Sequence, residues 1–172
     1  MIGLSQDKVK VVPYEPAWRD LYEAEAERIH AALGDKVLAV EHAGSTSVEG
    51  LDAKPIIDLM VAVASPASAA ELRPALAGLG YEFRPEDEVP GRLFFVRGPR
   101  DNRTHHLSLT ELDGEFWRVQ VLFRDHLRSH PDAADAYRRL KRKLAAKYPD
   151  DRPAYTAAKG EFILKTLEQA FL

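Results

Sequence analysis

The stretch that decides the fold is residues 42–59, which read HAGSTSVEGLDAKPIIDL. A predicted strand over 37–43 leads into a turn-like segment at 44–47, and a strongly apolar strand is predicted over 55–64. The Gly-Ser pair in the turn lets a main chain approach a phosphate closely, because glycine has no Cβ and the serine hydroxyl can donate. A Gly-Ser pair alone is weak evidence, since most such pairs are simply turns.

Asp58 is the most informative residue of the stretch. In a strand over 55–64, Asp58 and Met60 share one face, while Ile57 and Leu59 share the other. An unpaired carboxylate inside so apolar a run is costly. Asp58 is therefore expected to be paired, to bind a metal, or to lie at the open end of the strand. A buried, hydrogen-bonded aspartate is the purely structural alternative.

The rest of the chain predicts alternating helices and strands, followed by a helical half. Helical spacing and end signals predict helices near 16–33 and 66–79, and about three more from Glu115 onward, divided by Pro131 and by the prolines at 149 and 153. Further strands are expected over 8–14, 81–83, 92–97 and 103–110, the last two as a hairpin, with an acidic loop containing Glu86, Asp87 and Glu88 before them.

This order of elements predicts an α/β (α+β) fold. A mixed, twisted sheet is expected to carry helices on one side, with the helical C-terminal half closing over a cleft. The 172 residues are expected to form one domain, with a core over about 8–112 and a helical part over about 113–172.

Composition excludes several classes of protein. The chain has no cysteine, which excludes disulfide scaffolds, thiolate metal sites and cysteine catalysis. Its net charge of −3 gives no strong nucleic-acid signal, and no run of about 18 apolar residues predicts a membrane span. Without an export signal at the N-terminus, the expected location is the cytoplasm. The oligomeric state stays open.

The charge is unevenly distributed along the chain. Residues 115–147 contain nine Lys+Arg against four Asp+Glu, and residues 15–35 contain two against six. Solvated helix faces would explain this pattern. The alternative is that the C-terminal helices supply a cationic wall for an anionic ligand.

Strand parity separates the two adjacent histidines. His106 falls on a polar face with Ser108, whereas His105 falls with the apolar Leu107. His106 is therefore expected either to line the cleft or to be a plain surface histidine. Lys159 lies on the apolar stripe of the last predicted helix, so its head either snorkels at the edge of the core or reaches a phosphate site.

These motifs resemble the signature of the GrpB family. The resemblance starts with 42–59, continues through His106 and residues 122–128, and includes 155–163, so that it spans roughly residues 9 to 170. That family is similar to the nucleotidyltransferase fold of polymerase-β-like enzymes, and the resemblance implies that fold here.

The resemblance also implies a site. In that superfamily a Gly-Ser turn holds the nucleotide phosphates, and a nearby strand carries two carboxylates, one residue apart, that hold divalent metal. Gly44 and Ser45 match the turn and Asp58 matches the first carboxylate, but Met60 stands where the second would be. Two-metal chemistry needs several oxygen ligands. A second histidine that relatives often carry is replaced by Ser108.

Three hypotheses for function follow, and whether the protein is an enzyme is left open. The first is a metal-dependent nucleotidyltransferase that uses a nucleoside triphosphate and an unknown acceptor, with Asp58 and His106 as catalytic residues. Magnesium or manganese would be held by Asp58, Glu41, His106 and His42. The phosphates would be contacted by Gly44, Ser45, Thr46, Lys54, Arg124 and Lys159. The second hypothesis is a non-catalytic module that binds a nucleotide or phosphate, and the third is a metal-dependent hydrolase using His42, Asp58 and His106.

Overall fold

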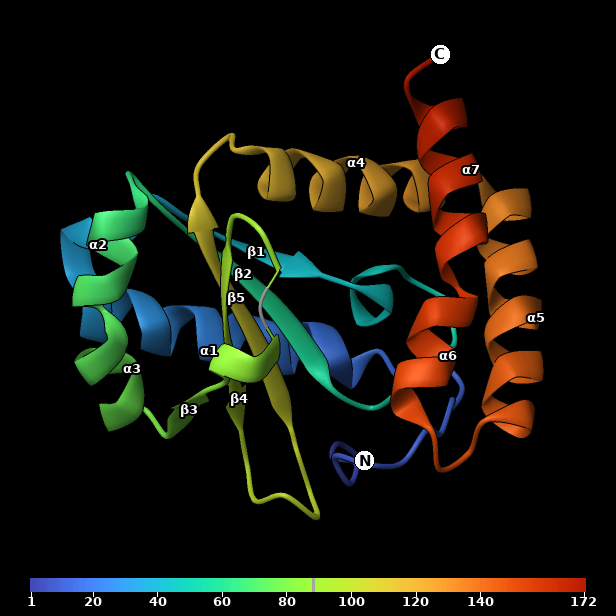
Figure 1. Cartoon of the computed structure of the whole chain (residues 1–172), viewed down its shortest axis with the longest axis horizontal. Coiled ribbons are helices and arrows are strands. Elements are labelled where there is room, and N and C mark those ends of the chain that lie inside the picture. Colours follow the sequence, from blue (N-terminus) through green and yellow to red (C-terminus); the bar gives the residue numbers. More distant parts are fainter. Residues whose placement is uncertain (88) are drawn as a thin grey trace.

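A five-stranded mixed sheet forms the centre of the computed structural model, which describes residues 1–87 and 89–172 (Figure 1). The strands are β1 (Ala39–Ala43), β2 (Ile57–Val63), β3 (Tyr81–Phe83), β4 (Arg92–Arg97) and β5 (His105–Glu111). Their order in the sheet is β1-β2-β5-β4-β3, with β2 and β5 parallel and the other pairs antiparallel. The predicted mixed sheet and the β4–β5 hairpin are confirmed. Glu88 of the predicted acidic loop lies outside the described residues.

Helices cover both faces of the sheet. They are α1 (Ala17–Leu33), α2 (Pro66–Glu71), α3 (Arg73–Gly78), α4 (Glu115–Ser129), α5 (Pro131–Lys147), α6 (Arg152–Ala158) and α7 (Gly160–Ala170). In Figure 1, α2 and α3 lie at one end of the molecule, and α5, α6 and α7 stand together at the other.

The two faces of β2 pack against different helices, as strand parity predicts. Ile57, Leu59, Val61 and Val63 join the main core with residues of α1, α2 and α3. Met60 and Ala62 point the other way and pack on Trp117 of α4. The expectation of helices on one side only was therefore incomplete, because α4 lies directly on the second face.

Three other predictions about elements need correction. The single helix predicted near 66–79 is divided at Leu72 into α2 and α3, since α3 begins anew with a proline in its first turn. The segment 8–14 is not a strand. Within it only Val12 forms an isolated bridge, exchanging backbone hydrogen bonds of 2.9 and 3.0 Å with Ala53, which precedes β2. Pro13 has no N–H to continue such a ladder. The C-terminal half contains four helices rather than three, since the last predicted helix divides at Lys159, just before Gly160.

The outer edge of β1 is capped by side chains. The Val40 carbonyl accepts a hydrogen bond of 3.0 Å from the Tyr22 hydroxyl, and the His42 carbonyl accepts one of 3.0 Å from Arg124 Nη1. Both carbonyls point away from β2, so these donors occupy acceptors with which another strand could pair.

None of the described helices is both long enough and apolar enough to cross a bilayer.

Candidate functional site

The turn after β1 brings its main chain against Asp58. Gly44 has φ 65° and ψ −171°, and a single 3₁₀ turn, Ser45–Ser47, follows it. A Cβ placed on Gly44 would lie 3.0 Å from Asp58 Cγ and would collide with the carboxylate oxygens. Glycine is therefore required here both for its positive φ and for the close approach.

Asp58 and His106 are neighbours across the parallel strands β2 and β5. They face each other in the register, and Asp58 Oδ1 lies 3.5 Å from His106 Nδ1. Burial alone would raise the pKa of Asp58, but His106, Lys54 and His42 together hold it below its usual value. Burial lowers the pKa of His106, although Asp58 opposes that shift. The pair thus combines a carboxylate with a largely neutral imidazole.

A cavity of about 230 Å³ opens beside this pair. It lies between the turn after β1, the start of β2, α4, α5 and the junction of α6 with α7. The residues that line it and were singled out from the sequence are Gly44, Ser45, Thr46, Lys54, Asp58, His106, Arg124 and Lys159. The structure therefore brings motifs from the first half of the chain and from the C-terminal helices to one cavity.

Two ammonium groups face this cavity without a carboxylate partner. The Nζ atoms of Lys54 and Lys159 lie 5.7 and 4.5 Å from the centre of the same ring, Tyr155. Within the described residues, no acidic oxygen lies within 4.0 Å of either nitrogen. Burial, then the neighbouring Lys159 and Arg152, lower the pKa of Lys54 to about 7. Burial lowers the pKa of Lys159 to about 8, against the pull of Asp58.

Sequence reasoning missed two further cations of this cluster, Lys141 and Arg152. Lys141 is 2% exposed, and its Nζ donates to the Asp52 carbonyl. Burial and the charges of Lys159 and Lys54 lower its pKa to about 7. The sequence did hold a signal, since a lysine lies between Tyr137 and Leu144 at i, i+4 and i+7 on one helix face.

Arg152 sits at the start of α6 and is held by the main chain of the N-terminal segment. Its guanidinium donates to the carbonyls of Ser5 (3.1 Å) and Lys8 (2.9 and 3.3 Å). No ion pair joins it to a carboxylate in the described parts of the chain. Its positive charge therefore adds to those of the lysines.

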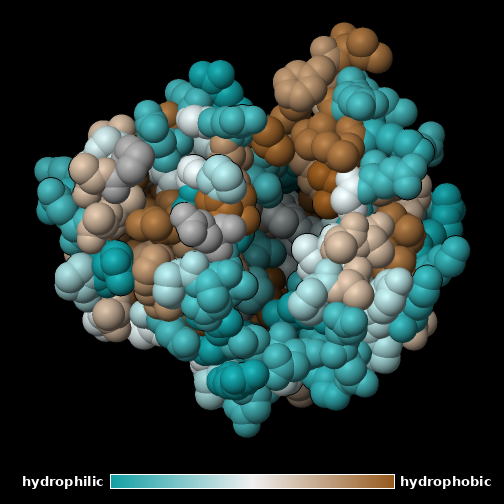
Figure 2. All heavy atoms as spheres, viewed as in Figure 1, coloured by the Kyte–Doolittle hydropathy of each residue, from teal (hydrophilic) through white to brown (hydrophobic). Residues whose placement is uncertain are grey.

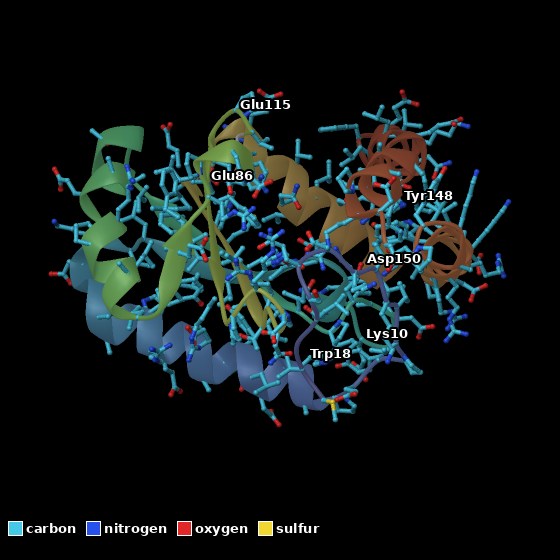
Figure 3. The ribbon with its side chains drawn as sticks, turned by 60° about the horizontal axis from the view of Figure 1, so that its bottom comes forward. Lys10, Trp18, Glu86, Glu115, Tyr148 and Asp150 are labelled. Atoms are coloured by element: carbon cyan, nitrogen blue, oxygen red, sulfur yellow. The ribbon has the colours of Figure 1, made fainter. Side chains whose placement is uncertain are left out.

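A larger groove of about 850 Å³ meets the cavity at the Asp58–His106 pair. Both are bounded by Gly44, Lys54, Asp58, His106, Gln120 and Lys159. The groove is visible as the hollow between the strands and the C-terminal helices in Figure 2. Figure 3 labels Asp150, which lines the groove from the connection between α5 and α6, and Glu86, which lies in the segment between β3 and β4. Its floor includes Met60, Phe94 and Ser108.

Arg124 is engaged in structural contacts. It donates to Glu41 Oε2 (2.7 Å), the His42 carbonyl (3.0 Å) and Asp125 Oδ1 (2.9 Å). These bonds occupy most of its five N–H donors. They tie α4 to β1, and Glu41 is thereby held by Arg124 rather than presented to Asp58.

His42 points to one face of the sheet, and Ala43 and its partner Asp58 on β2 point to the other. Its ring stacks on Tyr22 at 4.5 Å, and its Nε2 is 3.0 Å from Thr46 Oγ1. Burial lowers its pKa to about 4, so the ring is neutral at physiological pH. His42 and Glu41 line a separate cleft of about 990 Å³ beside α1 and α5. The structure therefore does not gather the predicted metal ligands around one point.

The donor set does not fit a two-metal centre. Within residues 1–87 and 89–172, no three His, Asp or Glu side chains are placed to hold one ion. Met60, at the second-carboxylate position, is 2% exposed and packs with Ala43, Ala62 and Trp117. The ammonium group of Lys54 acts on Asp58, and such a cation repels a divalent metal.

The lysine cluster predicts an unusual dependence of stability on pH. The pKa values of Lys54 and Lys141 are about 7 in the folded protein, against roughly 10.4 in an unfolded chain. Between these values the unfolded state binds more protons, so the unfolding free energy should rise with pH from about 7 to 9. Urea titrations at both ends of this range test it. A Lys54→Met, Lys141→Met double variant should lose most of the slope, whereas an unchanged slope would contradict the prediction.

Comparisons with known proteins agree with this architecture. The family model described as "GrpB protein" matches residues 8–169. A UPF0157 protein of Pseudomonas aeruginosa is 44% identical over 167 residues, which are 95% of this chain and 68% of that protein. The crystal structure of the conserved protein GrpB from Enterococcus faecalis superposes with a TM-score of 0.85 at 37% identity, covering 94% of this chain and 96% of that one.

A more distant likeness concerns the fold alone. The structure of Cid1, a nucleotidyltransferase, in complex with its short product ApU has a TM-score of 0.51 at 12% identity, and covers 76% of this chain and 40% of that one. The mixed sheet with its flanking helices is therefore nucleotidyltransferase-like.

Proposed function

Because this chain belongs to the GrpB family and has a nucleotidyltransferase-like fold, we propose that it binds a phosphorylated small molecule, a nucleotide being the first candidate. The ligand's phosphate lies in the cavity of about 230 Å³ beside the turn at Gly44. The observation that carries this proposal is the pair of ammonium groups, Lys54 and Lys159, that reach the cavity without a carboxylate partner.

The charges around the cavity favour an anion. Lys159 and Arg152 act on Lys54, Lys159 and Lys54 act on Lys141, and Arg152 acts on Lys159. Asp58 is an acid that acts on all four of these cations. Burial first, and neighbouring cations second, lower the pKa values of the three lysines, so the charged forms are unfavourable here. A phosphate bound beside Lys159 would relieve this repulsion.

The turn supplies the neutral contacts that a phosphate requires. The residues after Gly44 form a short turn whose side chains include the hydroxyls of Ser45 and Thr46, and both residues line the cavity. Gly44 lets the main chain approach Asp58, because a Cβ at this position would collide with the Asp58 carboxylate. Recognition in this proposal uses fixed cations and hydroxyls, so a divalent metal is not required.

Removal of either unpartnered ammonium group should weaken binding of the phosphate. Lys54→Met and Lys159→Met each remove one charge-assisted hydrogen bond, worth about 1.5–3 kcal/mol. The measurement is the thermal shift with ATP, inorganic phosphate and adenosine, each with and without Mg²⁺. A ligand present at about 100 times its Kd stabilises the protein by about 2.7 kcal/mol, and this shift should largely vanish in both variants.

The matched control is Lys143→Met, which removes an exposed lysine from α5. It should bind ATP and inorganic phosphate like the unchanged protein. The proposal fails if all three variants bind alike, if adenosine binds as tightly as ATP, or if binding requires Mg²⁺ in every case.

The Asp58–His106 pair favours a second candidate function, group transfer from the bound nucleotide. A carboxylate next to Nδ1 fixes the tautomer of the imidazole, which leaves Nε2 able to accept a proton from an attacking hydroxyl. The pair lies where the cavity meets the groove, so a second molecule could approach from the groove side. Release of pyrophosphate from ATP, lost in His106→Gln while ATP binding persists, would support transfer; binding without turnover supports the module alone. The third hypothesis, a hydrolase using His42, Asp58 and His106, would require His42 to act from the face of β1 that points away from Asp58.

A further inference from the structure

We propose that the Lys54 amine is a nucleophile, and that the cavity accepts a phosphorylated aldehyde or ketone whose carbonyl carbon forms an imine with Lys54 Nζ. The phosphate half of this inference rests on the proposed function, whereas the covalent half rests on the cluster of cations described above.

The geometry of the cluster leaves one lysine without a stable proton. Lys54 and Lys159 share the Tyr155 ring, within 5.7 and 4.5 Å of its centre, and Arg152 adds a permanent charge. Asp58 is the acid that faces them, and its carboxylate already lies 3.5 Å from His106. In this partly buried site, burial and the neighbouring cations both disfavour the charged forms of the lysines. An arginine does not give up its proton, so the neutral group must be a lysine.

Lys54 is the lysine best placed to react. Lys141 is 2% exposed and its Nζ is bound to the Asp52 carbonyl, so a ligand cannot reach it. Lys54 is half-buried and lines both the cavity and the groove. The Nζ atom of Lys159 lies closer to the centre of the Tyr155 ring, at 4.5 Å against 5.7 Å for Lys54, and the face of the ring favours its charged form. Lys159 is therefore the better phosphate ligand, and Lys54, whose pKa is lowered to about 7, is the better nucleophile.

The reaction is balanced without an added reagent. The neutral amine of Lys54 attacks the carbonyl carbon and gives a carbinolamine, which loses one water molecule to give the imine. No oxidation or reduction occurs: both hydrogens of the amine and the oxygen of the carbonyl leave as the water molecule. The Asp58–His106 pair lines the same cavity and offers a proton acceptor and donor for these two steps.

The test uses pyridoxal phosphate as the probe. The full chain is incubated at pH 7.5 with one equivalent of pyridoxal phosphate and reduced with borohydride, and the labelled lysines are identified by peptide mass spectrometry. Lys54 should carry about tenfold more label than any exposed lysine, because far more of its amine is neutral. Inorganic phosphate in excess should suppress that label, and pyridoxal without the phosphate should label Lys54 weakly.

Two variants keep the test decisive. Lys54→Arg keeps the positive charge but cannot form an imine, so specific labelling should disappear while phosphate still raises the melting temperature. Lys143→Arg removes an exposed lysine and should leave labelling of Lys54 unchanged. The inference is overturned if label is spread evenly over exposed lysines, or if Lys159 is labelled instead. Phosphate-suppressible binding of the probe without a Lys54 adduct would overturn the imine and leave phosphate binding intact.

Discussion

A Glu25→Ala variant is expected to lose about 3 kcal/mol of unfolding free energy. Glu25 is a 4% exposed carboxylate on α1 that ties three elements together. It accepts hydrogen bonds from Tyr81 Oη on β3 (2.8 Å), Arg97 Nη1 on β4 (2.9 Å) and Arg28 Nη1 (3.1 Å). Alanine would leave the Tyr81 hydroxyl buried without its acceptor and two guanidinium groups facing each other.

Urea denaturation at neutral pH measures this effect. The matched control is Glu27→Ala, which removes an exposed carboxylate from the same helix and should change stability by less than about 0.5 kcal/mol. The arginines are partly exposed, 40% for Arg28 and 33% for Arg97, so water compensates them in part and the loss stays at the lower end for a broken buried pair. A loss equal to that of Glu27→Ala would contradict the prediction.

Much of the fold was predictable because its signals are local. The alternation of β2 assigned its two faces correctly, and Ser65, whose hydroxyl accepts from Ser68 N, marked the start of α2. Gly34 ended α1 as expected, with φ 60°. The strand predicted over 8–14 was wrong because β-rich composition carries no information about a partner strand. In this segment only Val12 forms a bridge, to Ala53.

The site was less predictable, because it depends on which distant side chains meet. Parity placed His106 on the polar face of β5, and the motif placed Asp58 beside the turn. Neither could show that Arg124 would be engaged by Glu41 and by the edge carbonyl of His42. Arg152 was equally invisible, since its role depends on carbonyls near the N-terminus, roughly 145 residues away in the sequence.

Met60→Asp is the variant that tests whether this chain retains a latent two-carboxylate centre. We expect it to lose about 4 kcal/mol of unfolding free energy, because it removes buried packing on Trp117 and buries a carboxylate. Met60 also lies directly opposite Glu41 in the β1–β2 register, so the new charge would face a like charge. Urea denaturation measures the loss, and Met60→Leu, which conserves volume, should cost less than about 1.5 kcal/mol.

Repeating these titrations with Mg²⁺ separates destabilisation from the creation of a metal site. We expect Mg²⁺ to leave the Met60→Asp midpoint unchanged, because Glu41 is held by Arg124 at 2.7 Å and Lys54 and Lys159 face Asp58. To bind here, Mg²⁺ would have to displace Arg124 from Glu41 and approach the ammonium groups of Lys54 and Lys159. One added carboxylate does not offset that cost. Selective recovery of Met60→Asp by Mg²⁺, absent in Met60→Leu, would instead show that two carboxylates on this strand face suffice. That result would mean that the principal site is a metal site, that Met60 prevents metal binding in the unchanged protein, and that the cationic cavity has a lesser role.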